Sequence, residues 1–322
     1  MQTILLDATI AESTAIAQAA QALRAGDVVA FPTETVYGLG ADAFNADAVA
    51  NVFAAKGRPA DNPLIVHVAL QSGFERCALL SPRAERLIQA LTPGPLTLVL
   101  PSRPEVPAIV RAGLPTVAVR MPDHPVAHRL LLASGPLVAP SANRSGRPSP
   151  TTAQHVLDDL SGRIAAVLDG GPCRVGIEST VIDLSGAAPV LLRAGAVSPE
   201  AIAEVLGQPV IQSTTNPDAP RSPGMKYRHY APSVPLRIHV GAFPQLPADG
   251  KRRLLLTNAT PFPAIQEAHV EPLSEATFYQ LLRHAEGEGM EEIIVHLTNP
   301  NAVSAGLLDR ITKAAGGESP GA

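Results

Sequence analysis

Residues 31–67 read FPTETVYGLGADAFNADAVANVFAAKGRPADNPLIVH, and this stretch decides the fold class of the chain. The apolar run at residues 28–31 predicts a buried strand. A helix is predicted at residues 46–56, and a second apolar strand follows at residues 64–66. The alternation of strand, helix and strand predicts an α/β sheet.

Polar residues crowd the end of the first predicted strand. After Pro32 the chain carries Thr33, Glu34, Thr35 and Tyr37. Gly38 and Gly40 follow, and we expect them to form tight turns that a Cβ would obstruct. Because ligands of open α/β sheets bind where strands end, this stretch is a candidate binding edge.

Two cations follow the predicted helix. Lys56 and Arg58 stand two residues apart on either side of Gly57, and Pro59 follows them. Such a pair can bracket a polyphosphate, with the lysine as a point charge and the arginine as a planar fork. The same cations can instead complement the helix macrodipole, and the local pattern leaves both interpretations open.

The whole chain has 322 residues, which suits two domains, and 46% of them are apolar. A net charge of −4, 3% aromatic residues and no Trp argue against a large sequence-independent nucleic-acid surface.

Cys77 and Cys173 lie far apart without metal-ligand spacing, so we expect two buried thiols. No signal peptide or apolar run of about 20 residues is present, and we expect a cytoplasmic protein without a membrane segment.

Two further predicted strands end in polar residues. Arg120 closes the run at residues 114–121, where either a protein carboxylate or a ligand anion could pair with it. Ser141 and Asn143 follow a strand at residues 136–139, and alternate residues of an extended chain face the same way. Both sites extend the candidate binding edge.

Hydroxyl groups farther along the chain have structural as well as functional interpretations. Thr151 or Thr152 can cap the predicted helix at residues 153–160. Ser179 and Thr180 interrupt a β-favouring run, where a cross-strand hydroxyl pair is the structural interpretation. Arg193 ends another short strand and adds a cation.

The composition changes after Pro209. We predict a catalytic domain at residues 1–211, a linker at residues 212–235, a small domain of parallel strands and helices at residues 236–315 and a disordered tail at residues 316–322. The linker contains SPGMKYRHYAP, whose cations and tyrosines exceed what a spacer needs, although a solvated linker stays open.

The collected residues favour anion binding. The chain has no Walker A motif, no GxGxxG fingerprint, no GxSxG elbow and no HExxH pair. Cations and neutral hydrogen-bonding groups outnumber carboxylates in the candidate loops, which suits phosphoryl-type chemistry by positioning and charge stabilisation. A Mg²⁺ ion held mainly by substrate phosphates fits the scarcity of carboxylates.

Five motifs occur in order: PTETVYGLG, KGRPADNPLIVH, PSANRSGRPSPT, GIESTVID and SPGMKYRHYAP. Together they resemble the threonylcarbamoyl-AMP synthase family, in its long form. The resemblance covers residues 10–232 closely and the C-terminal part weakly. It implies a YrdC-like α/β fold, which is a twisted open mixed sheet with a concave cationic cavity, followed by a small Rossmann-like α/β domain.

The resemblance also implies a reaction. L-threonine, bicarbonate and ATP give L-threonylcarbamoyl-AMP and pyrophosphate, which makes the enzyme a nucleotidyltransferase. A separate complex then transfers the threonylcarbamoyl group to tRNA, and this complex is the candidate partner. Membrane attachment and stable nucleic-acid binding are not expected.

Site residues carry over from the family by motif. Threonine contacts are implied for Thr35, His67, Arg120, Ser141 and Ser179. ATP contacts are implied for Lys56, Arg58, Asn62, Thr116, Asn143, Thr151, Arg193 and Tyr230. Of these, Lys56, Arg58, Ser141 and Asn143 are predicted to be catalytic. No covalent nucleophile is needed, and His67 is only a hypothesis for the general base.

Two other functions compete with this one. A carbamoyl-adenylate-forming carbamoyltransferase, as in hydrogenase maturation proteins, has a related module, but this chain has no CxxC segment. A non-catalytic RNA-binding module could use the concave basic surface of the fold, but the charge balance weighs against it.

Overall fold

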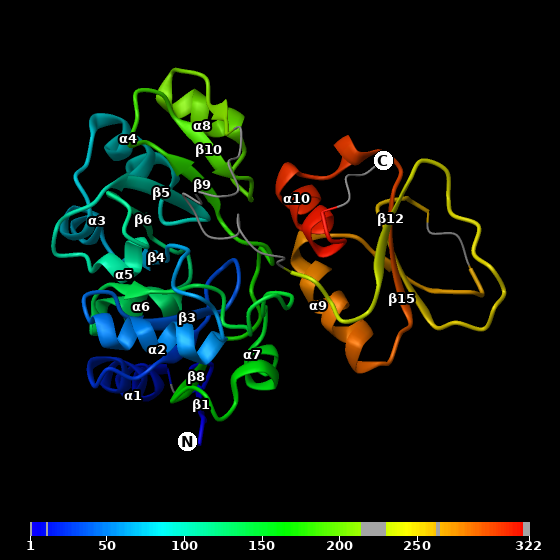
Figure 1. Ribbon diagram of the computed structural model, residues 1–322, viewed down its shortest axis with the longest axis horizontal. Coiled ribbons are helices and arrows are strands. Elements are labelled where there is room, and N and C mark those ends of the chain that lie inside the picture. The colour runs from blue at the N-terminus through cyan, green and yellow to red at the C-terminus, as the bar shows by residue number, and fades with distance from the viewer. Residues whose placement is uncertain (1, 11, 214–229, 262–264, 318–322) are drawn as a thin grey trace.

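The computed structural model describes residues 2–10, 12–213, 230–261 and 265–317, which form two sheets (Figure 1). The larger sheet has the strand order β1-β8-β2-β3-β7-β4-β6-β5-β9-β10-β11. Its strands are β1 (Ile4–Asp7), β2 (Val29–Phe31), β3 (Gly38–Asp42), β4 (Ile65–His67), β5 (Leu96–Pro101), β6 (Thr116–Arg120), β7 (Leu137–Val138), β8 (Ala166–Asp169), β9 (Thr180–Asp183), β10 (Val190–Arg193) and β11 (Ile211–Gln212). Parallel and antiparallel pairs occur together, which confirms the predicted mixed α/β sheet.

Helices cover both faces of the larger sheet. They are α1 (Glu12–Arg24), α2 (Ala46–Lys56), α3 (Gln71–Cys77), α4 (Pro82–Leu91), α5 (Ala108–Arg111), α6 (Pro125–Ser134), α7 (Ala153–Leu160) and α8 (Pro199–Leu206). The helices α1 and α6 share one core with Val29 and Phe31, whereas α2, α4 and α7 share the other core with Ala30. Successive strand residues therefore serve opposite faces, as the period of a β-strand requires.

Local signals account for the helices that were predicted correctly. The Asn45 side chain accepts hydrogen bonds from the backbone N–H groups of Asp47 and Ala48 and so caps α2. Gly57 ends α2 at φ +62°, a left-handed conformation that favours glycine. Thr152, rather than Thr151, caps α7 by accepting from the His155 N–H.

The expectation of turns at Gly38 and Gly40 is wrong. Both glycines lie in β3, which pairs antiparallel with β2. A Cβ at Gly40 would lie 2.9 Å from the Phe31 ring and 3.0 Å from the Val29 carbonyl oxygen. The glycines therefore permit close packing of β3 across β2. Strand β3 was not predicted because glycine has a low β-propensity.

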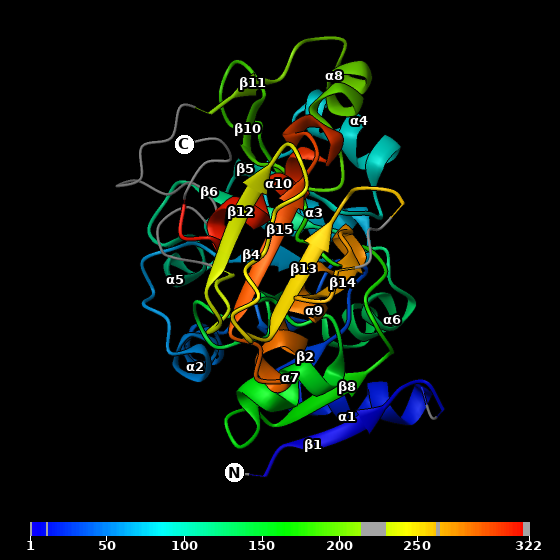
Figure 2. The same cartoon turned by 90° about the vertical axis from the view of Figure 1, so that its right-hand side faces the viewer.

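The smaller sheet is fully parallel, as predicted, with the order β12-β15-β13-β14. Its elements are β12 (Leu236–Val240), β13 (Arg253–Thr257), β14 (His269–Pro272), α9 (Glu275–Gly287), β15 (Glu292–Leu297), a 3₁₀ turn (Pro300–Ala302) and α10 (Ala305–Ala314). The helices α9 and α10 lie between the two sheets, and Figure 2 shows β12, β13 and β15 in front of them.

The predicted linker falls largely outside the described residues, since residues 214–229 belong to neither described range around it. The domain boundaries at residues 211 and 236 therefore stay a prediction, as does the tail, of which residues 318–322 are not described. Both cysteines are buried and free, as expected. Among the described residues, no helix combines the length and the apolar character that crossing a membrane requires.

Candidate active site

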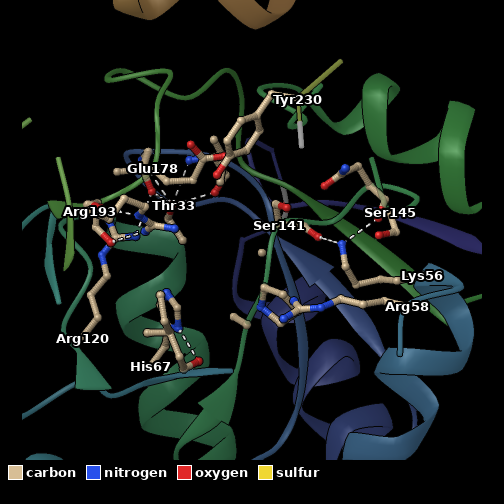
Figure 3. A pocket seen from close by; sticks show the side chains of 18 of the residues that line it. Thr33, Lys56, Arg58, His67, Arg120, Ser141, Ser145, Glu178, Arg193 and Tyr230 are labelled. Carbon is tan, nitrogen blue, oxygen red and sulfur yellow. Dashed lines mark hydrogen bonds between the residues drawn. The ribbon is translucent and has the colours of Figure 1, made fainter. Parts of the chain in front are cut away.

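A pocket opens where several strands of the larger sheet end (Figure 3). The loop after β2, the end of α2 and the strands β4, β6 and β10 each place polar side chains in it. Ten of the predicted site residues line it: Thr35, Lys56, Arg58, His67, Arg120, Ser141, Asn143, Ser179, Arg193 and Tyr230. The fold thus brings together residues that are up to about two hundred positions apart in the sequence.

Three predicted site residues lie outside the pocket lining. Asn62 lies near the start of β4, and Thr116 is the first residue of β6, which pairs in parallel with β4. Thr151 is buried, and its hydroxyl lies 3.4 Å from His155 Nδ1. Tyr37 is also absent from the lining, because its hydroxyl donates to the Gly171 carbonyl oxygen (2.7 Å) in the protein interior.

Arg120 has a protein carboxylate as its partner, which answers the question that the sequence left open. Its Nη2 lies 2.6 Å from Glu34 Oε1, and both side chains are at most 5% exposed. Its Nη1 donates to Thr35 Oγ1 at 2.8 Å and its Nε to the Gly94 carbonyl oxygen at 3.3 Å. The guanidinium is therefore fixed in orientation, and it still borders the pocket.

His67 lies near Arg120 on the floor of the pocket (Figure 3). Its Nδ1 is 3.2 Å from the Ile65 carbonyl oxygen, so Nδ1 carries the hydrogen and Nε2 is left as an acceptor. Burial, together with the charge of Arg120, lowers the pKa of His67 to about 3. A neutral imidazole of this kind accepts a hydrogen bond well but is a weak base at neutral pH.

Lys56 is buried at the end of α2 and is held by neutral groups. Its ammonium donates to the Ser141 carbonyl oxygen and to the Asn143 carbonyl oxygen, the latter at 2.7 Å. Burial, then the nearby charge of Arg58, lowers the pKa of Lys56 to about 7. The lysine thus links α2 to the loop after β7, and it has no carboxylate partner among the described residues.

Arg58 and Asn62 form a connected pair beside the pocket. The Arg58 Nη2 donates to the Asn62 carbonyl oxygen at 2.9 Å. The side-chain amide of Asn62 is fully buried, and neither its oxygen nor its nitrogen has a hydrogen-bond partner among the described residues. Since buried amides are normally satisfied, the Asn62 side chain is an exception within the described part of the chain.

Ser179 and Arg193 form the opposite wall. The Ser179 hydroxyl lies 2.7 Å from Thr97 Oγ1, which is the cross-strand hydroxyl pair that the sequence allowed. Arg193 donates from Nε to the Ser179 carbonyl oxygen (3.0 Å) and from Nη2 to the Ser179 hydroxyl (3.1 Å). Within the part of the chain that the structure describes, Arg193 therefore donates to neutral acceptors, as Lys56 does.

Four polar residues of the pocket lining were not predicted from the sequence as site residues. These are Thr33, Ser145, Arg147 and Glu178. All four belong to the motifs quoted above, so their membership in those motifs was the available signal. Of the four, Glu178 is the unexpected one, because it brings a buried carboxylate into a cationic pocket.

The described residues contain no cluster of three or more His, Cys, Asp and Glu side chains that could hold a metal ion. The pocket instead presents ammonium, guanidinium, hydroxyl and amide groups. This donor set suits phosphate and carboxylate groups, and a cation would have to arrive with its own anionic ligands. An open mixed α/β sheet with such a pocket defines an α/β protein that binds small anionic substrates.

Comparisons with known proteins identify the family. The family described as "Telomere recombination" matches residues 21–195, and the C-terminal domain of threonylcarbamoyl-AMP synthase matches residues 197–316. Threonylcarbamoyl-AMP synthase of Bacillus subtilis is 44% identical over 94% of this chain and 93% of its own, and that of Pyrococcus abyssi is 41% identical over 92% and 93%. The chain therefore belongs to the threonylcarbamoyl-AMP synthase family.

The solved structures agree with this family. The crystal structure of P. abyssi Sua5 complexed with L-threonine superposes with a TM-score of 0.87 at 40% identity and covers 99% of each chain. E. coli YciO, at 24% identity and a TM-score of 0.56, covers 62% of this chain and 98% of its own and shares the fold alone. The relatives named as synthases are enzymes, and the long match includes the small sheet.

Proposed function

We propose that this chain is an L-threonylcarbamoyl-AMP synthase of the nucleotidyltransferase class. In this reaction the threonine amine and bicarbonate form a carbamate and release water. A carbamate oxygen then attacks the α-phosphorus of ATP, and the bond to pyrophosphate breaks. The observation that carries the proposal is a pocket whose cations Lys56 and Arg193 are held by neutral groups, in a chain of this family.

Threonine would occupy the part of the pocket next to Arg120. The fixed guanidinium of Arg120 suits the carboxylate of the amino acid, and Thr35 and Ser141 border the same space. His67 Nε2 and the Ser179 hydroxyl can accept from the ammonium or the hydroxyl group of threonine. P. abyssi Sua5 has been solved in complex with L-threonine, which supports a threonine site in this chain.

ATP would occupy the side next to Lys56 and Arg58. The two cations suit the phosphates, and Asn143 lies on the loop that Lys56 holds. Asn62 and Thr116 extend the site past Arg58, where the unpartnered amide of Asn62 could bind the nucleotide. Arg193 and Tyr230 would enclose it from the opposite wall, and Thr151 is assigned to ATP by its motif alone.

A Mg²⁺ ion would be held mainly by the ATP phosphates, since the described residues offer no carboxylate cage. When bound, it would neutralise phosphate charge. The residues of the chain would act by orientation and by excluding water from the labile carbamate. With a pKa of about 3, His67 is a poor candidate for a general base, and no other described residue is assigned that role.

The location and the partner follow from the proposed activity. A transfer complex that uses the product to modify tRNA would be the partner, and the cytoplasm would be the site of action. Tyr230, the first described residue after residues 214–229, lines the pocket and supports the prediction that the linker covers the nucleotide.

The test is pyrophosphate release from ATP by the purified chain, with Mg²⁺ and bicarbonate, with and without L-threonine. We expect release that requires both threonine and bicarbonate. Threonine-independent release that carbamoyl phosphate stimulates would indicate carbamoyl transfer instead. Salt-dependent RNA binding without any release would indicate a binding module.

A further inference from the structure

Glu178 in the pocket wall is held by residues of the C-terminal part of the chain. Its Oε2 accepts from Arg310 Nε at 2.7 Å and from the Tyr279 hydroxyl at 3.0 Å. Its Oε1 accepts from the Ser149 hydroxyl at 2.5 Å. One carboxylate thus joins the loop after β7 to the helices α9 and α10.

Burial makes this contact consequential. Arg310 and Tyr279 are fully buried, and Glu178 is 7% exposed. Burial alone would raise the pKa of Glu178, but the charges of Arg310 and Arg193 and the hydrogen bonds from Arg310 and Ser149 lower it to about 2. Glu178 is therefore ionised at neutral pH, and without Arg310 it would be a buried carboxylate lacking its direct ion-pair partner.

The backbones at this contact approach too closely for side chains. Gly176, at φ +84°, lies against α9, where a Cβ would be 2.4 Å from the Glu275 carbonyl oxygen. A Cβ at Gly306 of α10 would lie 2.9 Å from the Gly195 Cα. The glycines before Glu178 and after Arg193 therefore allow α9 and α10 to pack closely against the chain.

The same residues hold Tyr230 over the pocket. Its ring centroid lies 5.5 Å from that of Tyr279, and the Arg310 guanidinium lies 5.4 Å from the ring centre. Tyr230 adopts φ +65°, which is uncommon for a residue with a side chain and persists only where the surroundings enforce it. Arg310 also donates to the Ala194 carbonyl oxygen, next to Arg193.

We propose that Arg310 and Tyr279 are positioning residues for the synthase reaction. By holding Glu178 and the Tyr230 ring, they keep Ser179, Arg193 and the loop containing Ser149 in the geometry that binds substrate. The C-terminal helices thereby complete the pocket wall although they contribute no group to its lining among the described residues. This inference rests on the proposed function, because its principal measurement is turnover.

The experiment compares four full-length variants in steady-state kinetics for ATP and for L-threonine, with thermal unfolding of each. Arg310→Met leaves Glu178 without its ion pair, and we expect kcat/KM to fall about 10- to 100-fold because the carboxylate leaves its position. Glu178→Gln combined with Arg310→Met removes both charges. The kcat/KM of this double variant should be about tenfold higher than that of Arg310→Met alone. Tyr279→Phe removes one hydrogen bond and should cost about two- to fivefold.

The matched control is Arg253→Met. Arg253 is also a buried arginine of the C-terminal part, paired with Glu292 at 2.7 Å, but it lies on β13 and does not line the pocket. Its loss should lower the unfolding temperature and leave turnover unchanged. The pH profile adds a second readout, since Arg310→Met should regain activity as the pH falls and the unpaired Glu178 becomes protonated.

Wild-type turnover in Arg310→Met would overturn the inference, as would a double variant as inactive as Arg310→Met at an unfolding temperature equal to that of wild type. If Arg310→Met does not fold, Tyr279→Phe and Arg310→Lys decide the matter, and unchanged kinetics in both would contradict the proposal. Absence of threonine-dependent turnover in the wild type would instead contradict the proposed function, and the two failures are thus distinguishable.

Discussion

Buried cations of the two sheets have different kinds of hydrogen-bond partner. Arg253 of the smaller sheet has two carboxylate partners, Asp249 at 2.6 Å and Glu292 at 2.7 Å. Lys56 in the pocket of the larger sheet donates to two backbone carbonyl oxygens instead. Arg193 likewise donates to the carbonyl and hydroxyl oxygens of Ser179.

On the proposed function, this difference separates a structural cation from a cation that binds substrate. Carboxylate partners neutralise Arg253 and leave no net charge for a ligand. Neutral dipoles fix the position of Lys56 and Arg193 but leave their charge available to an anion. Arg120 has both kinds of partner, since its Nη2 pairs with Glu34 while its Nη1 and Nε donate to neutral oxygens, and it borders the pocket.

The largest expected effect separates Lys56 from Arg253. We expect Lys56→Met to lower kcat/KM about 10²- to 10³-fold, because the phosphates lose a preorganised charge. Arg58→Ala should have a comparable effect and leave the fold intact. Steady-state kinetics and circular dichroism check this, with Arg253→Met as the control. Equal activity losses in Lys56→Met and Arg253→Met would erase the distinction.

The pH dependence of ATP binding tests the charge of Lys56. Its pKa of about 7 means that, before ATP binds, the ammonium predominates below pH 7 and the neutral amine above it. Each pH unit above about 8 should weaken ATP binding by up to about tenfold, because the charged fraction falls in that proportion. Calorimetric titration across pH 6–9 measures this.

Lys56→Arg provides the matched control for the pH experiment, because arginine keeps its charge over this range. Its binding should be weaker throughout but flatter with pH. A wild-type profile as flat as that of Lys56→Arg would show that the lysine stays charged in the free protein.

Tyr230→Ala should have an intermediate effect. Loss of the ring that packs on Tyr279 and Arg310 should raise the KM for ATP about tenfold, through the lost aromatic and cation–π contacts and the exposed pocket. Tyr230→Phe keeps the ring and should remain close to wild type. An unchanged KM in the alanine variant would make this residue part of a spacer only.

Asn62→Ala should have the smallest effect. Its amide has no partner among the described residues, so the loss of it should cost little stability. The KM for ATP should nevertheless rise about three- to tenfold if the nucleotide supplies the partner. Thermal unfolding and kinetics together decide, and a large fall in unfolding temperature with unchanged KM would assign Asn62 a structural role.

Much of the fold followed from local sequence signals. The helices at residues 46–56 and 153–160 have the predicted bounds, because caps such as Asn45 and Gly57 act over a few residues. Strand β3 was missed because glycine disfavours strands locally, and only its packing on Phe31 explains it.

The residues of the pocket were also largely predictable, but the ion pairs that hold them were not. The motifs contain eight of the ten predicted lining residues, and the other two, Arg120 and Arg193, stand at the ends of predicted strands. Glu34, the partner of Arg120, lies in the first motif, 86 positions before the arginine. Arg310, the partner of Glu178, lies 132 positions after the glutamate. Pairings of this kind depend on tertiary contacts, which no local pattern encodes.

The most direct test of the account follows the carbon of bicarbonate. The purified chain is incubated with ¹³C-bicarbonate, ATP, Mg²⁺ and L-threonine, and the nucleotide products are separated and weighed by mass spectrometry. We expect an adenylate that contains threonine and one ¹³C atom, and we expect Lys56→Met to form far less of it. An adenylate without threonine, or no labelled adenylate at all from the wild-type chain, would contradict it.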